Sequence, residues 1–366
     1  MKKCIFHLPY EININWPSGS QIRPVNMLKA FKRLGYSVDI VMGKGSERKK
    51  QIKQIKNNIS NGVKYDFLYS ESSTMPTLLT EKHHFPTYPV LDFEFFKFCK
   101  CNNIKVGLFY RDIYWNFKEY NGEMKLYKRI VSKFFYLMDL IIYNKLVDVL
   151  YLPSQRMFNY LPIKYKGKVF ELPPGMDMYE LNKFTSNANL DKENLNIFYV
   201  GGIGNHYRME KLFKVARDNE NVKLNICCRE KEWKLWKDQY KDYTNSRINI
   251  IHKSGSDLIP YFNEADLFSL FLSPSQYREF AMPVKLFEYL SHMKPIIASS
   301  GTAVGDFVSK HDVGWSIDYT EHDLNSLLNY IVKNKHIIKD KISNINSVIS
   351  LNTWESRVTE VVNSLN

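Results

Sequence analysis

The most restrictive segment of the chain is residues 278–301, which read REFAMPVKLFEYLSHMKPIIASSG. Pro283 suits the first turn of a helix, where a missing N–H costs nothing, and Pro295 cannot continue one, so about three helical turns are expected between them. IIASSG is an apolar run closed by small turn-forming residues, which is typical of a covered parallel strand. The segment therefore predicts a helix and a buried strand of an α/β domain.

This predicted helix is apolar on two sides and has a single polar stripe. Lys285, Glu288 and His292 lie at i, i+3 and i+7, so they share that stripe. The stripe either faces a cleft of the domain or is an exposed Lys–Glu pair, which would stabilise the helix by only a few tenths of a kcal/mol. The residues of the helix alone leave both interpretations open.

Length and composition indicate a folded protein with two domains. The chain has 366 residues, enough for two cores of ordinary size, and its 44% hydrophobic and 24% charged residues give no disorder signature. The net charge of +13 favours anionic partners. No basic run is combined with a nucleic-acid recognition motif, so nucleic acid is not the expected partner. A membrane surface or phosphate-bearing substrates fit better.

Neither a signal peptide nor a membrane-spanning segment is expected. The apolar run that opens the chain is too short for a signal sequence, and residues 134–152, the nearest approach to a span, are interrupted by charges. We expect a cytoplasmic protein, either free or peripheral on the inner face of the membrane. The five cysteines are odd in number and lack CxxC spacing, so disulfides and structural zinc are not expected.

The order strand–loop–helix begins twice along the chain. Residues 3–42 contain a strand, the loop Pro17–Ser20, an amphipathic helix and a second strand, and LNIFYVGGIGNHYRMEKLFKVA at 195–216 restarts the pattern. Between them LPPGMD, with two prolines and a glycine, marks a boundary. The predicted domains are 1–172, joined by a terminal helix at about 352–366, and 173–351.

The stretch PVKLFEYLSHMKPIIAS resembles the nucleotide-sugar-binding segment of family 4 glycosyltransferases. These are retaining enzymes of the GT-B fold, in which two Rossmann-like domains face each other across a cleft and a C-terminal helix crosses back to the first domain. The resemblance implies that Glu288 holds the ribose hydroxyls, and that Pro283 and Lys285 at the helix start face the diphosphate and sugar. A carboxylate accepts from both hydroxyls of a diol, and free N–H groups at a helix start bind anions.

The chain departs from that family at two places. A second glutamate is usual at position 280, where this chain has Phe280; either the loop is one residue longer and Glu279 serves, or the acidic contact to the sugar is absent. Gly202 stands where an arginine is usual, so Arg208, with Lys285 as the second cation, is expected to bind the diphosphate.

Three further positions follow from the resemblance. It implies that Gly19 in the first loop lies under the donor phosphates, that the loop with Ser254 lies against the base, and that Asp112 faces the acceptor or sugar. An Arg111–Asp112 pair of purely structural importance is the alternative. The predicted catalytic residues are Asp112, Glu279, Arg208 and Lys285, and the predicted donor-binding residues are Gly19, Gly202, Arg208, Ser254, Pro283, Lys285 and Glu288.

The implied activity is transfer of a sugar from a UDP-, GDP- or dTDP-linked donor to a glycan or lipid-linked glycan in bacterial surface polysaccharide (capsule or lipopolysaccharide) synthesis. No DxD motif is present, and the resemblance to the GT-B class, which does not require a metal, implies a reaction that needs neither metal nor cofactor. Two alternatives stay open: a nucleotide-sugar epimerase of the same fold, and a non-catalytic glycan- or membrane-binding protein.

Two basic segments permit two interpretations each. The lysine-rich residues 44–59 form either a solvated helix face or a contact with phospholipid. Residues 124–149 combine aromatic and basic side chains, which is typical of a core helix with snorkelling lysines, or of a helix that docks on a membrane.

Overall fold

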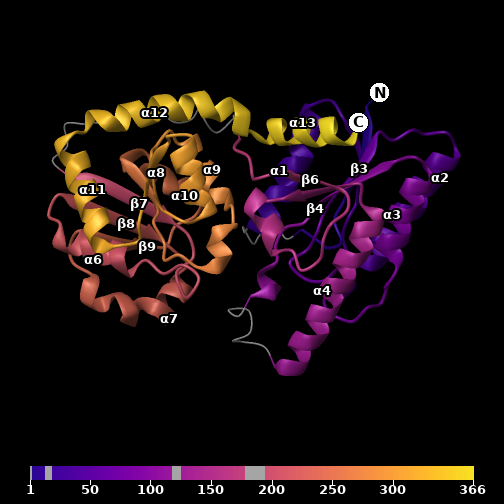
Figure 1. Ribbon diagram of the computed structural model, residues 1–366, viewed down its shortest axis with the longest axis horizontal. Helices are drawn as coiled ribbons and strands as arrows, with labels where there is room; N and C mark the ends of the chain where they lie inside the picture. The colour runs from indigo at the N-terminus through magenta and orange to yellow at the C-terminus, as the bar shows by residue number, and fades with distance from the viewer. Residues whose placement is uncertain (1, 13–18, 118–124, 178–193) are drawn as a thin grey trace. The chain divides into compact units, whose positions relative to one another are not determined.

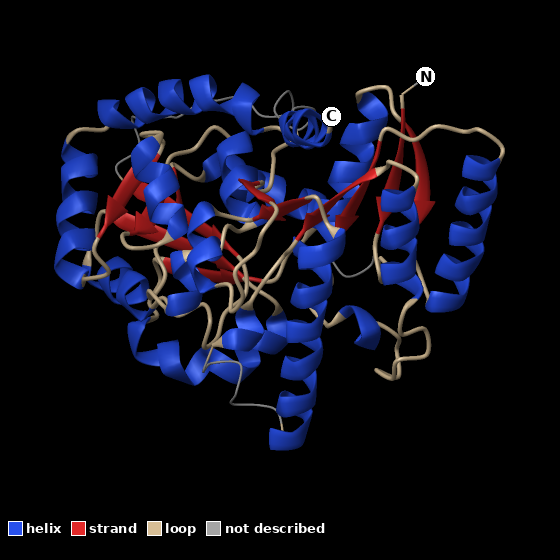
Figure 2. Ribbon diagram, turned by 45° about the vertical axis from the view of Figure 1, so that its right-hand side comes forward, coloured by secondary structure: helices blue, strands red, loops and turns tan. Residues whose placement is uncertain are grey.

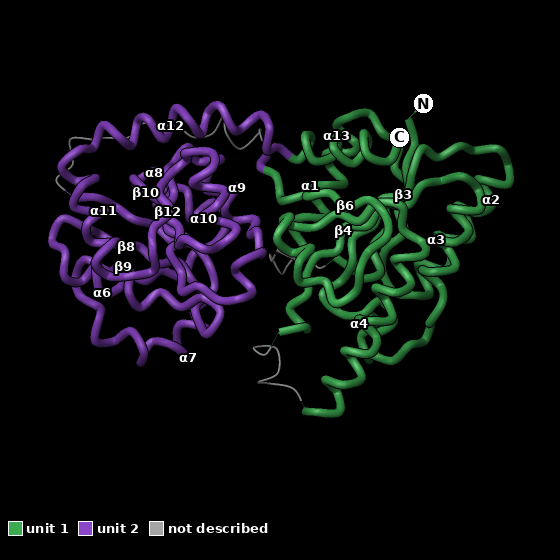
Figure 3. Tube along the Cα trace, in the orientation of Figure 1, with its two compact units in different colours: residues 1–175, 354–366 green, residues 176–353 purple. Residues whose placement is uncertain are grey.

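The chain folds into two compact α/β units (Figure 3). The computed structural model describes residues 2–12, 19–117, 125–177 and 194–366. Unit 1 comprises residues 1–175 and 354–366, and unit 2 comprises residues 176–353. Each unit is a Rossmann-like domain in which helices cover a parallel six-stranded sheet, as Figure 2 shows by element type.

In unit 1 the strands follow the order β2-β1-β3-β4-β5-β6, all parallel (Figure 1). The strands are β1 (Lys3–His7), β2 (Ser37–Val41), β3 (Phe67–Glu71), β4 (Lys105–Phe109), β5 (Val149–Leu152) and β6 (Lys168–Glu171). The helices are α1 (Gly19–Arg33), α2 (Gly45–Ser60), α3 (Leu91–Cys101), α4 (Leu126–Leu146) and α13 (Trp354–Leu365), with 3-10 turns η1 (Thr77–Leu79), η2 (Tyr114–Asn116) and η4 (Gln155–Tyr160).

The C-terminal helix α13 completes the core of unit 1, as the resemblance implied. Trp354 and Leu365, at its two ends, are buried with side chains of α1 and the sheet. Gly107 on β4 permits this packing, because a Cβ there would lie 2.9 Å from a methyl group of Leu365. Arg357 of α13 also donates to the carbonyl oxygen of Pro173 at 3.1 Å, which anchors the last segment before unit 2.

In unit 2 the sheet order is β12-β11-β10-β7-β8-β9. The strands are β7 (Leu195–Val200), β8 (Val222–Cys227), β9 (Ile248–Ile251), β10 (Leu267–Leu270), β11 (Ile296–Ser299) and β12 (Gly314–Ile317). The helices are α6 (Glu210–Asp218), α7 (Glu230–Tyr240), α8 (Ile259–Glu264), α9 (Val284–Ser291), α10 (Ala303–Lys310), α11 (Glu321–Lys333) and α12 (His336–Ile349), with 3-10 turns η5 (Lys241–Tyr243), η6 (Gly255–Leu258), η7 (Gln276–Glu279) and η8 (Ser350–Asn352).

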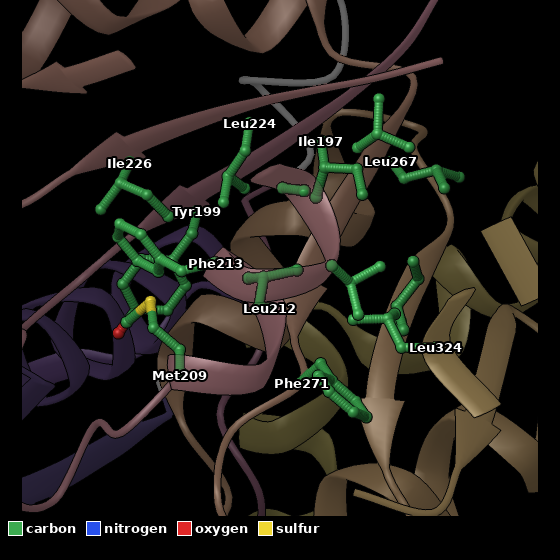
Figure 4. Close-up of a cluster of buried hydrophobic side chains, with 14 of the residues drawn as sticks. Ile197, Tyr199, Met209, Leu212, Phe213, Leu224, Ile226, Leu267, Phe271 and Leu324 are labelled. Carbon is green, nitrogen blue, oxygen red and sulfur yellow. The ribbon is translucent and has the colours of Figure 1, made fainter. Parts of the chain in front are cut away.

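Both faces of the unit 2 sheet are buried, because alternate residues of each strand enter different cores. On β7, Ile197 and Tyr199 pack with Leu212 and Phe213 of α6 on one face (Figure 4). Phe198 enters the other core, with α8, α9 and α10. This double coverage explains why the strands read as continuous apolar runs.

Two sequence expectations about local structure are wrong. Gly19 and Ser20, expected in a loop, are the first residues of α1, and the helix continues through Pro24; the rest of that expected loop, like residues 178–193, lies outside the described residues. The helix α9 has eight residues, just over two turns rather than three, and ends at Ser291.

The early end of α9 removes His292 from the predicted polar stripe. His292 is the C-cap residue, and Met293 after it takes a left-handed conformation with φ of 57°. The His292 ring is buried and stacks on Phe262 with 3.9 Å between ring centroids. Because Pro295 restricts Lys294 to extended geometry, the chain must leave the helix before it, and the imidazole turns into the core.

Candidate functional site

The carboxyl edge of the unit 2 sheet opens between β7 and β10. The strand connections reverse direction between these two neighbours, and ligands of open α/β sheets bind at such a point. The two strands are in register only at Ile197–Phe198, opposite Leu267–Phe268, so their last residues lie outside the ladder. The hydroxyl of Tyr289 on α9 bonds to both backbone groups of Val200 instead.

The loops that follow β7 and β10 are joined to each other at this opening. The backbone N–H of Ser273 donates to the carbonyl oxygen of Arg208 at 2.9 Å. The guanidinium of Arg278, in η7, donates to the carbonyl oxygen of His206 and lies 5.4 Å from the centroid of the Tyr207 ring. The two loops therefore form a single lining on this side of the sheet edge.

Arg278 is half-buried and has no carboxylate in an ion pair with it among the described residues. Its electrostatic neighbours include the hydroxyls of Tyr199, Tyr207 and Tyr319, and burial lowers its pKa. An arginine is effectively always charged, so its remaining N–H groups are suited to an anionic ligand.

Helix α9 presents the second half-buried charged group. Within the described part of the chain, the Lys285 ammonium and the Glu288 carboxylate form no hydrogen bond or ion pair, even with each other. Burial lowers the pKa of Lys285, the Glu288 charge partly raises it, and Arg229 lowers it further. Charged side chains in such a setting are costly without a partner, which favours a ligand that supplies one.

The start of α9 is also available to an anion. Its N-cap residue is Pro283 in extended conformation, which makes no side-chain hydrogen bond to the first N–H groups of the helix. Helix N-termini carry partial positive charge and unsatisfied donors. Pro283 and Lys285 thus occupy one end of α9, and Glu288 lies about one turn further along.

The backbone of Arg208 belongs to this lining, but its side chain already has a carboxylate partner. Its guanidinium is 56% exposed and forms an ion pair with Glu210 at 2.8 Å, which raises its pKa. Its other electrostatic neighbours include Tyr319 and Tyr240, whereas those of Lys285 include Glu288, Cys227 and Arg229. Arg208 lines a hollow beside Lys211 and Lys214, each of which is also bonded within the protein. The two lists share no residue, and joint binding of a diphosphate by Arg208 and Lys285 stays a prediction.

The predicted loop residues of unit 2 lie at the carboxyl ends of its strands. Gly202 follows β7, and its carbonyl oxygen accepts from the Tyr199 hydroxyl at 2.7 Å. A Cβ at Gly202 would lie 3.0 Å from the Tyr207 ring, so a larger residue there would require this exposed ring to shift. Ser254 follows β9, is exposed, and precedes Gly255, whose φ is +57°.

The alternatives at positions 279 and 280 differ in burial. Phe280 is 1% exposed and packs edge-to-face on Tyr277 with centroids 5.3 Å apart. Position 280 therefore presents no side chain to a ligand. Glu279 is the last residue of η7 and is half-buried. Of the two positions, only 279 can supply an acidic contact to the sugar.

Two predicted residues belong to unit 1. Asp112 accepts a hydrogen bond from the backbone N–H of Tyr114, at the start of η2. Its neighbour Arg111 donates to Glu71 of β3 at 3.0 Å. Gly19 begins α1. The roles of Asp112 and Gly19 in donor or acceptor binding stay predictions.

Neither a metal-binding cluster nor a membrane-spanning helix occurs in the described part of the chain. Among residues 2–12, 19–117, 125–177 and 194–366, no group of three His, Cys, Asp or Glu side chains is arranged to hold a metal ion. None of the described helices is long and apolar enough to cross a membrane.

Comparison with known proteins indicates the class of enzyme to which this chain is similar. Residues 182–346 match the family model described as "Glycosyl transferases group 1". They form a group 1 glycosyl transferase domain. The chain is accordingly an enzyme of the glycosyltransferase class. The match covers nearly the whole of unit 2, including both loops and the helix α9 that line the opening between β7 and β10.

Solved structures confirm the GT-B fold around this group 1 domain. HepE of Anabaena in complex with UDP-glucose has a TM-score of 0.65 at 12% identity, covering 99% of each chain. WaaG, a glycosyltransferase involved in lipopolysaccharide biosynthesis, has a TM-score of 0.63 at 12% identity and covers 98% of this chain and 99% of its own. Sucrose-phosphate synthase of Thermosynechococcus elongatus has a TM-score of 0.65 at 12% identity, covering 98% and 97%. No curated protein matches.

Two residues of the group 1 domain were missed at the sequence level. Arg278 could have been found, because a cation that follows a parallel strand lies at the ligand-binding edge of the sheet. Tyr289 gave no signal, because a tyrosine between apolar neighbours on a helix is ordinarily a core residue.

Proposed function

We propose that unit 2 binds a nucleoside-diphosphate sugar at the carboxyl edge of its sheet, and that the protein transfers the sugar to a glycan or a lipid-linked glycan. The observation that carries the proposal is the set of half-buried charged side chains at this edge, Arg278, Lys285 and Glu288, none of which has an ion-pair partner among the described residues. Two cations and one carboxylate match a ligand that has a diphosphate and a diol.

Each group has a distinct task in this proposal. Glu288 accepts hydrogen bonds from the two ribose hydroxyls. Lys285 and the first N–H groups of α9 neutralise the diphosphate, while Arg278 binds a phosphate oxygen with the donors that His206 leaves unused. Glu279, at the end of η7, is the candidate for a contact to the donor sugar. Arg208 keeps Glu210 as its partner and is not required.

The transfer is proposed to retain the configuration at the anomeric carbon and to need no metal. The bond between the anomeric carbon and the diphosphate oxygen breaks, and the acceptor oxygen bonds to the same face of that carbon. The leaving phosphate takes the proton of the acceptor hydroxyl. Arg278, Lys285 and the helix start then stabilise the negative charge that develops on the diphosphate, which is the largest demand of such a step.

The acceptor is proposed to belong to a bacterial surface polysaccharide. The basic net charge of +13 suits glycans and lipid-linked glycans that carry phosphate or carboxylate groups. WaaG, which shares the fold, acts in lipopolysaccharide biosynthesis. The nucleotide of the donor is proposed to be UDP, GDP or dTDP.

Calorimetric titration of the full chain tests the donor site. UDP, GDP and dTDP are titrated into the wild type and into Glu288→Ala and Lys285→Ala. One nucleotide is expected to bind, with a loss of about 1.5–3 kcal/mol of binding free energy, or at least tenfold in affinity, in each variant. Glu321→Ala and Lys214→Ala are matched controls, because these exposed residues pair with each other on the same unit. Unchanged affinity in both site variants would refute the proposal.

A turnover assay separates the transferase from its alternatives. Release of the nucleoside diphosphate that depends on an added acceptor is the expected result. Isomerised sugar from the donor alone would indicate an epimerase. Tight nucleotide binding with neither reaction, across a set of surface-glycan acceptors, would indicate a binding protein of the same fold.

A further inference from the structure

Helix α4 buries one side against unit 1, and its amino-terminal half has an exposed apolar side opposite to the buried one. At about 100° per residue, one side points into unit 1 and contains the buried residues Ser132, Tyr136, Asp139, Leu140 and Tyr143. The opposite side contains the exposed apolar residues Leu126, Tyr127, Ile130, Val131 and Phe134. Their exposed fractions run from 48% for Val131 to 62% for Phe134, so this apolar side faces solvent along more than two turns.

Positive charge surrounds this exposed stripe. Lys125, Lys128, Arg129 and Lys133 lie on the same segment, and residues 125–138 contain no Asp or Glu. The first carboxyl group of the helix, Asp139, is on the buried side. We call the exposed apolar residues of 126–134 and these four cations the α4 surface. In Figure 1 this end of α4 extends beyond the other elements of unit 1.

The combination of charge and apolar area is specific to α4. Helices α1 and α2 of unit 1 are also basic. On α1 two of the cations, Arg23 and Arg33, pair with carboxylates, and Ile22 is its one exposed large hydrophobic residue among those described. Helix α2 has exposed Lys49, Lys50 and Lys53. None of the large hydrophobic side chains exposed in the described residues lies on α2. Its lysines are accounted for by solvation, with Ile52 and Ile55 buried beneath them. The α4 surface has an apolar stripe for which solvation gives no account.

We propose that the α4 surface docks the protein on an anionic lipid bilayer. An apolar stripe flanked by cations is the pattern of a helix that lies in the plane of the membrane, with its side chains among the acyl chains and its cations at the phosphates. With its cations, α4 is not apolar enough to cross a membrane. The lack of carboxylates across 125–138 favours a uniformly anionic surface over a protein partner of mixed charge. The proposal goes beyond donor binding and rests on unit 1 alone.

Co-sedimentation of the full-length protein with vesicles tests the proposal. The wild type is expected to bind vesicles of phosphatidylglycerol and phosphatidylcholine at low salt, and to bind pure phosphatidylcholine at least about tenfold less. High salt is expected to weaken but not abolish binding, because the apolar contact is not screened. Failure of the wild type to bind the anionic vesicles at low salt would overturn the proposal.

Two double variants separate the contributions of the surface. Ile130→Gln with Phe134→Gln is expected to lower partitioning at least about thirtyfold. Lys128→Gln with Lys133→Gln is expected to lower it about twentyfold. The controls are Leu235→Gln on α7, at a residue that is 79% exposed, and Lys49→Gln with Lys50→Gln on α2, which matches the change of charge.

The remaining outcomes also decide the question. If the lysine pair on α2 matters as much as the pair on α4, binding is diffuse attraction and the proposal fails. If the wild type forms a dimer in sedimentation analysis that the Ile130 and Phe134 substitutions dissociate, and does not bind vesicles, the surface joins two copies of the chain. Circular dichroism checks that each variant is folded. If the variant with Ile130 and Phe134 substituted is unfolded, the variant with Lys128 and Lys133 substituted, which keeps the apolar side chains, decides the question.

Discussion

The hydroxyl of Tyr289 accepts a hydrogen bond from the backbone N–H of Val200 at 2.8 Å and donates one to the carbonyl oxygen of the same residue at 3.2 Å. A side chain of α9 thereby replaces the neighbouring strand at the end of β7, where β10 has left the ladder. The helix with Lys285 and Glu288 is fixed to the strand from which the loop 201–209 departs. The opening at the sheet edge thus leaves no unsatisfied backbone at Val200.

Tyr289→Phe should lower both stability and nucleotide affinity. The substitution removes the partner of the half-buried N–H and carbonyl of Val200, which costs about 1–3 kcal/mol in the free energy of unfolding. Because α9 loses its tether to β7, nucleotide affinity is expected to fall about threefold to tenfold. Denaturant titration and calorimetry measure the two effects. Tyr330→Phe, at a tyrosine that is 55% exposed, is the control, and a Tyr289 variant that behaves like it would contradict the tether.

Arg278, and not Arg208, should control affinity for the diphosphate. Arg278→Gln is expected to weaken binding of a nucleoside diphosphate by about 1.5–3 kcal/mol and to weaken the nucleoside much less, because only the diphosphate contacts the guanidinium. Arg208→Gln breaks its pair with Glu210 and is expected to leave affinity within about twofold. Calorimetry with both ligands measures the difference. A larger loss of diphosphate affinity in Arg208→Gln than in Arg278→Gln would show that Arg208 is the residue that binds the diphosphate.

His292 should make the protein less stable in mild acid. Burial, with Lys294 nearby, lowers the pKa of His292 from 6.5 to about 4. Below pH 6.5 the imidazole is protonated in the unfolded chain, whereas in the folded chain it stays neutral down to about pH 4. The free energy of unfolding therefore falls as the pH drops through this window, by about 3 kcal/mol in total. His292→Phe should remove this part of the slope in denaturant titrations. His322→Gln, at a highly exposed histidine, should leave the slope unchanged.

Asp139 should have the opposite pH dependence. Burial raises the pKa of its carboxyl from 3.8 to about 7, although the N–H of Thr77 donates to Oδ2 at 2.7 Å. Between these values the folded chain holds a proton that the unfolded chain has lost, so this carboxyl destabilises the fold as pH rises toward 7.

The matching variant is Asp139→Asn, which keeps the acceptor for Thr77 and removes the charge. It is expected to raise the free energy of unfolding by about 1–3 kcal/mol at pH 8 and by less at pH 5. Thermal unfolding at the two pH values measures the change. Asp148→Asn is the control, because Asp148 is partly exposed and pairs with Lys100 at 2.8 Å. A gain for Asp139→Asn that is larger at pH 5 would contradict the assigned pKa.

The sequence by itself determined the architecture. Alternation of buried strands with amphipathic helices requires a parallel sheet covered on both faces, and a second start of this pattern after LPPGMD requires two such units. The apolar period of α13 fixed which face it buries. These features depend on local periodicity, which can be followed along the chain without knowledge of distant contacts.

Only the tertiary structure decided which charged groups lack partners. In the sequence, Arg208 and Arg278 are each an arginine that follows a strand and has a glutamate within two residues. In the structure Arg208 pairs with Glu210, whereas Arg278 lies among tyrosines. Pro295 requires α9 to end before it, but the burial of the His292 ring on Phe262, thirty positions away, could be seen only in the folded structure. Burial and ion pairing depend on which residues meet in space, and sequence spacing carries no information about a meeting between separate loops.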